Sequence, residues 1–209
     1  KQLLEMIGIT KRRKLPKLAT TRFSTWFKNY SQQSTDKKVV LFNDTYNEFN
    51  EPNIGISAVK VLNHFGFEVI IPPLKCCGRP MISKGVLKEA KKQAEAVFQQ
   101  LLPYVEAGYP IIGLEPSCIL TIKDDFKSLL GKKCDALVNS TTTFDEFMYK
   151  VIKERELEAK TPLTILVHGH CHQKSLVGMK PTLELLKRVK NVQVKEIDSG
   201  CCGMAGSFG

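Results

Sequence analysis

The sequence lacks any apolar run long enough to cross a bilayer as a helix. A helical span takes about 18 or more consecutive apolar residues, and no run among the 209 residues approaches that length. No signal-peptide pattern is visible after Lys1 either. We therefore expect a cytoplasmic protein whose contact with the inner membrane face is at most peripheral.

Acidic residues are scarce in the first part of the chain, and this scarcity accounts for most of the net charge of +10. Residues 1–38 carry ten Lys or Arg side chains against Glu5 and Asp36. The rest of the chain is nearly balanced, so the charge does not indicate a nucleic-acid-binding body. We interpret residues 1–37 as a basic linker from an upstream domain that is absent from this chain. Contact with a polyanion or a membrane surface is the alternative interpretation.

The sequence also offers no obvious acid–base pair or nucleophile–base set, so we expect no catalytic residues in this chain alone. It does offer short apolar runs that alternate with helical patterns. We predict strands at residues 39–43, 67–71, 109–114, 163–167 and 192–197, and helices at 54–65, 86–104, 119–130 and 181–189. This alternation predicts an α/β fold with right-handed βαβ units and parallel sheets.

The same pattern occurs twice, which predicts two tandem units. The first unit covers residues 38–134, a helical bridge covers residues 135–160, and the second unit covers residues 161–209. The sequence stops where a third strand of the second unit is expected. We therefore expect that the second unit is truncated at its C-terminus.

Seven cysteines form the most informative pattern, because two Cys-Cys-Gly triplets occur at residues 76–78 and 201–203. An odd number of cysteines without a secretory signal favours metal binding or redox chemistry over a disulfide framework. Adjacent thiols reach one site only through a turn, and the glycine can supply the positive φ that such a turn needs.

Four of the five predicted strands are followed by cysteines. The residues concerned are Cys76, Cys77, Cys118, Cys171, Cys201 and Cys202. In parallel sheets, ligands bind beyond the carboxyl ends of the strands, so these thiols are the candidate ligands. Cys134 follows no predicted strand and is interpreted as a non-ligand, and His64 is interpreted as structural.

Four interpretations of these thiols remain open. They could be small buried apolar groups, a vicinal disulfide switch, a zinc site that includes His172, or ligands of an iron–sulfur cluster. A site rich in thiolates favours the cluster. We expect His168, His170 and His172 to lie around such a site as hydrogen-bond donors rather than as ligands. If a strand continued through them, the three imidazoles would share one face, opposite Cys171.

The residues around the second triplet carry a family resemblance. The segments 167–172 (Val-His-Gly-His-Cys-His) and 198–208 (Asp-Ser-Gly-Cys-Cys-Gly-Met-Ala-Gly-Ser-Phe) resemble the cysteine-rich CCG iron–sulfur proteins. That family includes the CCG-containing subunit of heterodisulfide reductase and the iron–sulfur subunit of glycolate oxidase. The wording is most similar to fused proteins in which an FAD-linked D-2-hydroxyacid oxidase module and a ferredoxin-like segment precede this domain.

The resemblance implies a [4Fe–4S] cluster in the intact protein, held by Cys171, Cys201 and Cys202. It implies weaker ligands in the first unit at Cys76, Cys77 and Cys118, where Asp44 occupies the place of the leading cysteine and Glu115 that of a further cysteine. The closing cysteine of the second unit would lie beyond Gly209, so the site here could be empty or hold zinc.

The function that the resemblance implies is electron relay. Electrons would pass from FAD in an upstream 2-hydroxyacid dehydrogenase module, of the D-lactate or glycolate type, through ferredoxin-like clusters to this domain. A quinone or another acceptor would follow, with no nucleic-acid partner. The alternatives are a heterodisulfide or thiol reductase whose cluster binds substrate, and a zinc-stabilised structural domain.

Overall fold

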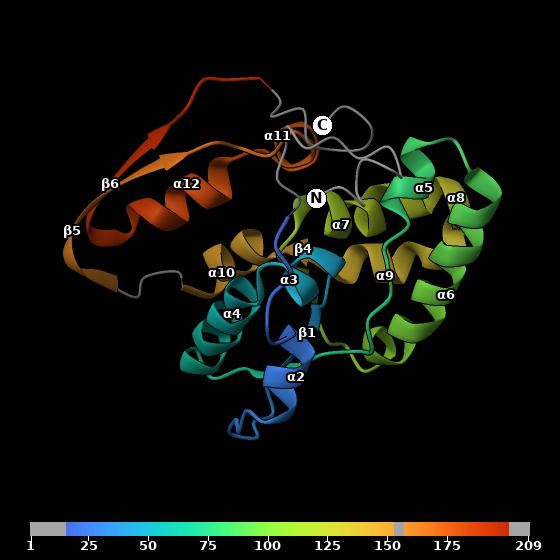
Figure 1. Ribbon diagram of the computed structural model, residues 1–209, viewed down its shortest axis with the longest axis horizontal. Coiled ribbons are helices and arrows are strands. Elements are labelled where there is room, and N and C mark those ends of the chain that lie inside the picture. The colour runs from blue at the N-terminus through green and yellow to red at the C-terminus, as the bar shows by residue number, and fades with distance from the viewer. Residues whose placement is uncertain (1–15, 153–156, 201–209) are drawn as a thin grey trace, which may run out of the picture.

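The main sheet has four parallel strands in the order β2–β1–β3–β4 (Figure 1). Its strands are β1 (Lys38–Phe42), β2 (Glu68–Ile70), β3 (Ile111–Gly113) and β4 (Thr141–Thr143). A second sheet pairs β5 (Leu157–Val167) with β6 (Val189–Glu196), also in parallel. The computed structural model describes residues 16–152 and 157–200. The predicted α/β class with parallel sheets is confirmed.

The central strand β1 is buried on both faces because it is a continuous apolar run between two helical layers. Val40 and Phe42 contribute to one hydrophobic core, and Val39 and Leu41 contribute to the other. This division follows from the alternation of side chains along a strand. The sheet therefore separates two cores, each closed by its own helices.

One face of the sheet is covered by helices that follow β2 and β3. They are α6 (Leu87–Glu106), α7 (Pro116–Leu120), the π-helix η1 (Thr121–Asp125), α8 (Phe126–Leu130), the 3-10 turn η2 (Gly131–Cys134) and α9 (Asp135–Ser140). The other face is covered by α2 (Phe23–Lys28), α4 (Pro52–His64) and α10 (Phe144–Ile152). Two short helices, α3 (Thr45–Phe49) and α5 (Arg79–Ser83), lie in the loops after β1 and β2.

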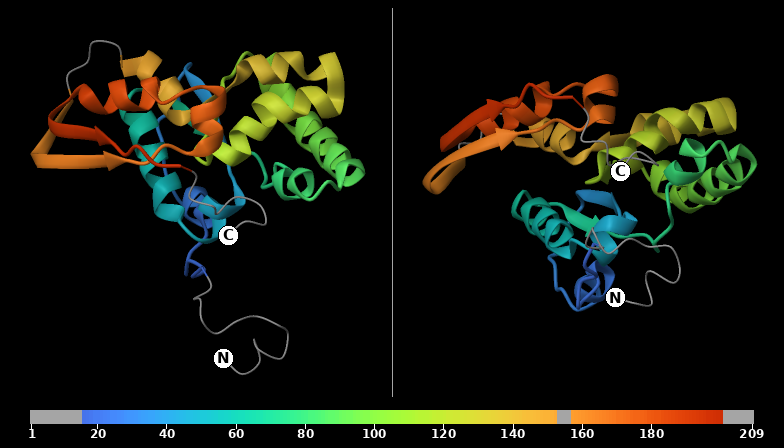
Figure 2. Two further views of the ribbon diagram at one scale, coloured as in Figure 1. Left: turned by 90° about the horizontal axis from the view of Figure 1, so that it is seen from above. Right: turned by 45° about the horizontal axis from the view of Figure 1, so that its top comes forward.

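The second sheet lies beside the first unit and carries two helices, α11 (Cys171–Leu176) and α12 (Lys180–Lys187) (Figures 1 and 2). α12 packs against α10, and α11 packs against α7. At the α10–α12 contact the guanidinium of Arg188 lies 4.3 Å from the ring centroid of Tyr149 and donates to its carbonyl oxygen at 3.1 Å. The two units are thus joined by helices rather than by a continuous sheet.

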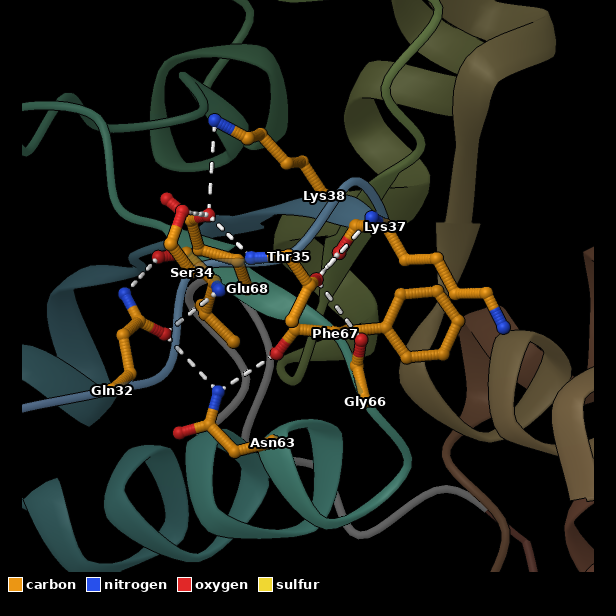
Figure 3. A network of polar contacts seen from close by, with 10 residues as sticks. Gln32, Ser34, Thr35, Lys37, Lys38, Asn63, Gly66, Phe67 and Glu68 are labelled. Carbon is orange, nitrogen blue, oxygen red and sulfur yellow. Dashed lines mark hydrogen bonds and ion pairs between the residues drawn. The ribbon is translucent and has the colours of Figure 1, made fainter.

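The outer edge of β2 is covered by the segment that precedes β1 (Figure 3). The side-chain amide of Gln32 donates to the carbonyl oxygen of Val69 at 2.8 Å and accepts from the Val69 N–H at 2.9 Å. It therefore pairs with the strand as a neighbouring backbone would, and an unpaired strand edge is a site for unwanted strand pairing. Ser34 and Thr35 bind the carboxylate of the next residue, Glu68.

The predicted helical bridge at residues 135–160 is wrong in two places. Residues 141–143 form β4, at one end of the main sheet, and residues 157–160 already belong to β5. Three consecutive threonines favour extended backbone because they are β-branched, but the apolar periodicity of α10 hides this signal. β5 and β6 also begin six and three residues earlier than predicted.

Candidate functional site

The first unit brings its three candidate thiols together. Cys76 and Cys77 lie in the loop after β2, and Cys118 lies in α7 after β3. The thiol of Cys77 is within hydrogen-bonding contact of both Cys76 and Cys118. Cys77 is buried and the other two are half-buried. The carboxyl ends of two parallel strands therefore deliver these sulfurs to one place, as their positions after the strands predicted.

The turn between Cys77 and α5 depends on Gly78. Its φ is +87°, in the left-handed region that a side chain disfavours. The N–H of Gly78 donates to Sγ of Cys76 at 3.5 Å, and Gln93 Nε2 donates to the Cys76 carbonyl oxygen at 2.7 Å. The predicted positive φ after the first cysteine pair is confirmed. The second triplet lies outside the described residues.

The three thiols of the first unit stabilise one another as neutral groups. Hydrogen bonding to Cys118, together with burial, raises the pKa of Cys77 to about 12. Hydrogen bonding to Cys77 and burial raise the pKa of Cys76 still further. Both thiols therefore stay protonated at neutral pH in the absence of a metal, whose binding would have to displace those protons.

Asp44 occupies the carboxyl end of β1 but serves as the N-cap of α3. One carboxylate oxygen accepts from the N–H of Asn47 at 2.9 Å, and the other accepts from its side-chain amide at 2.5 Å. Burial raises the pKa of Asp44, and the charge of nearby Glu115 raises it further. Glu115 likewise caps α7 by accepting from the N–H of Ser117. Both carboxylates are thus used by the local backbone.

In the second unit, β5 ends at Val167 and Cys171 is the first residue of α11. The strand does not continue through the histidines, so the alternative in which they share one strand face does not arise. His170 is the N-cap of α11, and its Nδ1 accepts from the N–H of His172 at 3.2 Å. Cys201 and Cys202 lie outside the described residues.

The three imidazoles have different surroundings. His168 Nε2 lies 3.0 Å from the carbonyl oxygen of Gly200, the residue before Cys201. His170 Nε2 lies 3.8 Å from Oε1 of Glu115, which links the two units. Burial and the charge of Arg79 lower the pKa of His172. The described contacts of these histidines are therefore with oxygen, backbone and charged groups.

Cys134 lies apart from these thiols. It is fully buried in η2, and its Sγ donates to the Gly131 carbonyl oxygen at 3.1 Å. His64 packs edge-on against the ring of Phe65 at the end of α4. The interpretation of both residues as structural stays a prediction.

Within residues 16–152 and 157–200, no three His, Cys, Asp or Glu side chains are arranged to hold a metal ion. As placed, the thiols of the first unit contact one another in a row, Cys76–Cys77–Cys118, and do not form a cage that fits a cluster. Across the same residues, no helix is long and apolar enough to cross a membrane.

Sequence reasoning missed a buried polar cluster that joins the two units. Gln173 Nε2 donates to Asp145 Oδ2 at 2.6 Å and contacts Thr182 Oγ1 at 2.8 Å, and Thr182 Oγ1 also donates to Asp145 Oδ2. Gln173 is only 6% exposed. Its position two residues after Cys171 is the one signal that could have drawn attention to it. Arg79 and Asp125, an ion pair of 2.8 Å between α5 and η1, were also missed.

The parallel α/β fold and the thiols at its strand ends define a cysteine-rich domain of the α/β class. The family described as "Cysteine-rich domain" (CCG) matches residues 40–123, which run from β1 into η1. The chain belongs to this CCG family. The resemblance inferred from the residues is therefore confirmed, although the family match covers the first unit rather than the second.

Three relatives show the extent of the similarity. The C-type subunit of anaerobic glycerol-3-phosphate dehydrogenase from Escherichia coli K12 is 30% identical over 216 residues, which cover 100% of this chain and 54% of the relative. Lactate utilization proteins A 1 and A 2 of Bacillus mycoides KBAB4 are 30% and 31% identical; each match covers 82% of this chain, and 72% and 74% of the relatives. The chain thus spans about half the length of the dehydrogenase subunit.

Proposed function

We propose that this chain is the iron–sulfur electron-transfer part of an oxidoreductase. The observation that carries the proposal is the convergence of thiols at the carboxyl ends of parallel strands in a CCG-family chain. The names of the relatives, a dehydrogenase subunit and two lactate utilization proteins, support an oxidoreductase setting.

The cluster is proposed for the second unit, with Cys171, Cys201 and Cys202 as its ligands. When bound, such a cluster accepts and donates single electrons at a potential set by its ligands and surroundings. Cys171 starts a helix whose preceding residue, His170, is held by both the backbone of His172 and Glu115. We propose that these contacts fix the direction of the Cys171 side chain and that the three histidines tune the site.

The first unit is proposed to have a different role, because its leading position is an acid. Both carboxylate oxygens of Asp44 are engaged by Asn47. The row of thiols favours a second candidate function, a heterodisulfide-type reductase in which sulfur groups exchange with a thiol substrate. The redox-active residues of that candidate would be Cys76, Cys77 and Cys118.

The electron source and acceptor follow from the resemblance. We propose that an FAD-linked 2-hydroxyacid dehydrogenase and ferredoxin-like clusters, on the same chain or a partner protein, deliver electrons to this domain. A quinone or another acceptor would then receive them. A cytoplasmic location with peripheral membrane contact fits this role.

Metal and sulfide analysis of the full-length protein, purified without oxygen, tests the proposal. We expect about four iron and four sulfide per chain with a visible charge-transfer band, as one [4Fe–4S] cluster requires. Cys171→Ser, Cys201→Ser and Cys202→Ser should each remove the iron, whereas Cys134→Ser, the matched control, should retain it. Stoichiometric zinc without sulfide would overturn the electron-transfer function and leave the zinc-stabilised domain.

A thiol-exchange assay separates the second candidate. The reductase function predicts that Cys77→Ser abolishes cleavage of a mixed disulfide while the iron content is unchanged. Retention of that cleavage in Cys77→Ser would exclude the first unit as its site.

A further inference from the structure

A cavity of about 610 Å³ lies at the carboxyl ends of β3 and β4, away from the row of thiols. Its walls come from both units: α4, the loop between β3 and α7, and the start of α10 in the first, and Gln173 and Thr182 in the second. Cavities of roughly 300–1,000 Å³ are typical of small-molecule sites. The size and the shared walls therefore call for a functional explanation.

The position of the cavity follows from the topology of the sheet. After β1 the chain turns into α4 on one face, whereas after β3 it turns into α7–α9 on the other face (Figure 1). β1 and β3 are neighbours, so the chain leaves two adjacent strands toward opposite faces. Ligands of open parallel sheets bind at such a switch point, because the diverging loops leave a crevice there. The cavity is lined by α4 and by Leu114 and Pro116 after β3, which places it at this point.

The lining is mainly apolar. On α4 it includes Ile54 and Val61, which are 48% and 38% exposed, and opposite them Leu114 and Phe144. Large apolar side chains that stay exposed in a concave surface mark binding sites more often than isolated exposed ones do. An apolar ligand would cover them.

The charge of the lining selects among apolar ligands. Asp145 is the one charged side chain among the lining residues that the structure describes, and no described Lys, Arg or His forms an ion pair with it. Gln173 and Thr182 both bind its Oδ2, which leaves Oδ1 to accept from a ligand. An anion would be repelled by this carboxylate, whereas a ligand hydroxyl or N–H could donate to it.

We propose that this cavity is a binding site for a neutral, mainly apolar small molecule that carries a hydrogen-bond donor. The apolar part contacts Ile54, Val61 and Phe144, and the donor binds the Asp145 carboxylate. Pro116 and Gln173 each lie two residues from a thiol-bearing position, Cys118 and Cys171, so the ligand lies beside both units' cysteine-bearing helices. The binding site does not depend on the proposed electron-transfer function.

Naphthol, a neutral aromatic alcohol, is the probe, and naphthoate and methoxynaphthalene are its matched analogues. Naphthoate replaces the hydroxyl by an anion, and methoxynaphthalene removes the donor. Titration of the full-length protein, followed by calorimetry and by methyl NMR of Ile54, Val61 and Leu114, should show naphthol binding with shifts at these methyls. Naphthoate should bind about tenfold more weakly, and methoxynaphthalene should also bind more weakly. Equal or tighter binding of either analogue would overturn the assigned chemistry.

Two tryptophan variants locate the ligand. Ser57 lines the cavity from α4, whereas Lys60 is exposed on the same helix outside the lining. Ser57→Trp should weaken naphthol binding about tenfold or more, and Lys60→Trp should leave it within about twofold of the parent chain. Unchanged binding in Ser57→Trp would show that naphthol binds elsewhere and would overturn the site.

A third variant tests the role of the carboxylate. Asp145→Asn keeps an acceptor for Gln173 and Thr182 but removes the charge, so it should narrow the difference between naphthol and naphthoate. An unchanged difference would overturn the role given to Asp145. Self-association of the parent chain that Ser57→Trp abolishes would assign the groove to a second copy instead and would overturn the small-molecule site.

Discussion

The strand pairs β1–β2 and β5–β6 are both parallel and both precede cysteine pairs, yet they differ sharply in burial. Four of the five residues of β1 are buried, whereas none of the eleven residues of β5 is. β1 is flanked by β2 and β3 and covered by helices on both faces, while β5 pairs with β6 alone among the described strands. An apolar run therefore becomes a core strand only when neighbouring strands and helices enclose it.

The residues that follow the two leading strands differ in chemistry. Asp44 follows β1 and caps α3 with both carboxylate oxygens, whereas Cys171 follows β5 and starts α11 with its thiol not needed for capping, because His170 performs that role. The same position in two similar units therefore stabilises a helix in one and offers a candidate ligand in the other.

The burial contrast between β1 and β5 can be tested directly, and it should give the greatest loss of stability. Leu41→Ala removes a fully buried side chain from β1 and should lower the free energy of unfolding by about 3 kcal/mol, through lost burial and a cavity. Leu166→Ala on β5, whose side chain is 63% exposed, should cost less than about 0.5 kcal/mol. Urea unfolding of both variants measures the difference. Equal costs would mean that the exposed face of β5 is covered in solution.

A second comparison uses the glycines after two strands. A Cβ at Gly113 would lie 2.4 Å from Cβ of Ile119, next to the backbone of α7, so Gly113→Ala should cost about 2 kcal/mol. A Cβ at Gly169 would meet the ends of the Lys174 and Met179 side chains, which can move, so Gly169→Ala should cost about 1 kcal/mol or less. Thermal unfolding distinguishes the two, and a larger loss for Gly169→Ala would contradict the explanation.

A smaller effect is expected at the covered edge of β2. Gln32→Ala removes both hydrogen bonds to Val69 and should cost about 1 kcal/mol. Gln33→Ala, its exposed neighbour, is the control and should be neutral. Hydrogen exchange at the Val69 N–H should also speed up in Gln32→Ala alone. Unchanged exchange there would show that the amide does not protect the strand.

The weakest of these effects concerns Glu68 on the same edge. The hydroxyl of Ser34 and the N–H of Thr35, with a smaller contribution from Lys38, lower the pKa of Glu68 below its ordinary value of 4.5. A lowered pKa in the folded state means that the carboxylate contributes stability above pH 4.5, and that this is lost as the pH falls through the folded-state pKa. Ser34→Ala should move the pKa back toward 4.5 in an NMR titration of the Glu68 carboxyl carbon. No shift would contradict the assigned cause.

Much of the fold was predictable because its strands are continuous apolar runs. The runs that became β1, β2 and β3 needed no tertiary information, and neither did the placement of Cys76, Cys77 and Cys118 beyond strand ends. β4 was not predictable, because its three threonines are polar and become strand only by pairing with β3. The polar cluster of Asp145, Gln173 and Thr182 was equally hidden, since its members are far apart in sequence.

Local sequence was sufficient for the α/β class, the turn at Gly78 and the family, because these depend on periodicity, on glycine and on residue type. Tertiary contacts were needed to establish which apolar run is buried, that Asp44 caps a helix, and that a cavity forms where the two units meet. These features depend on segments distant along the chain, and contacts of that kind leave no periodic pattern in the sequence.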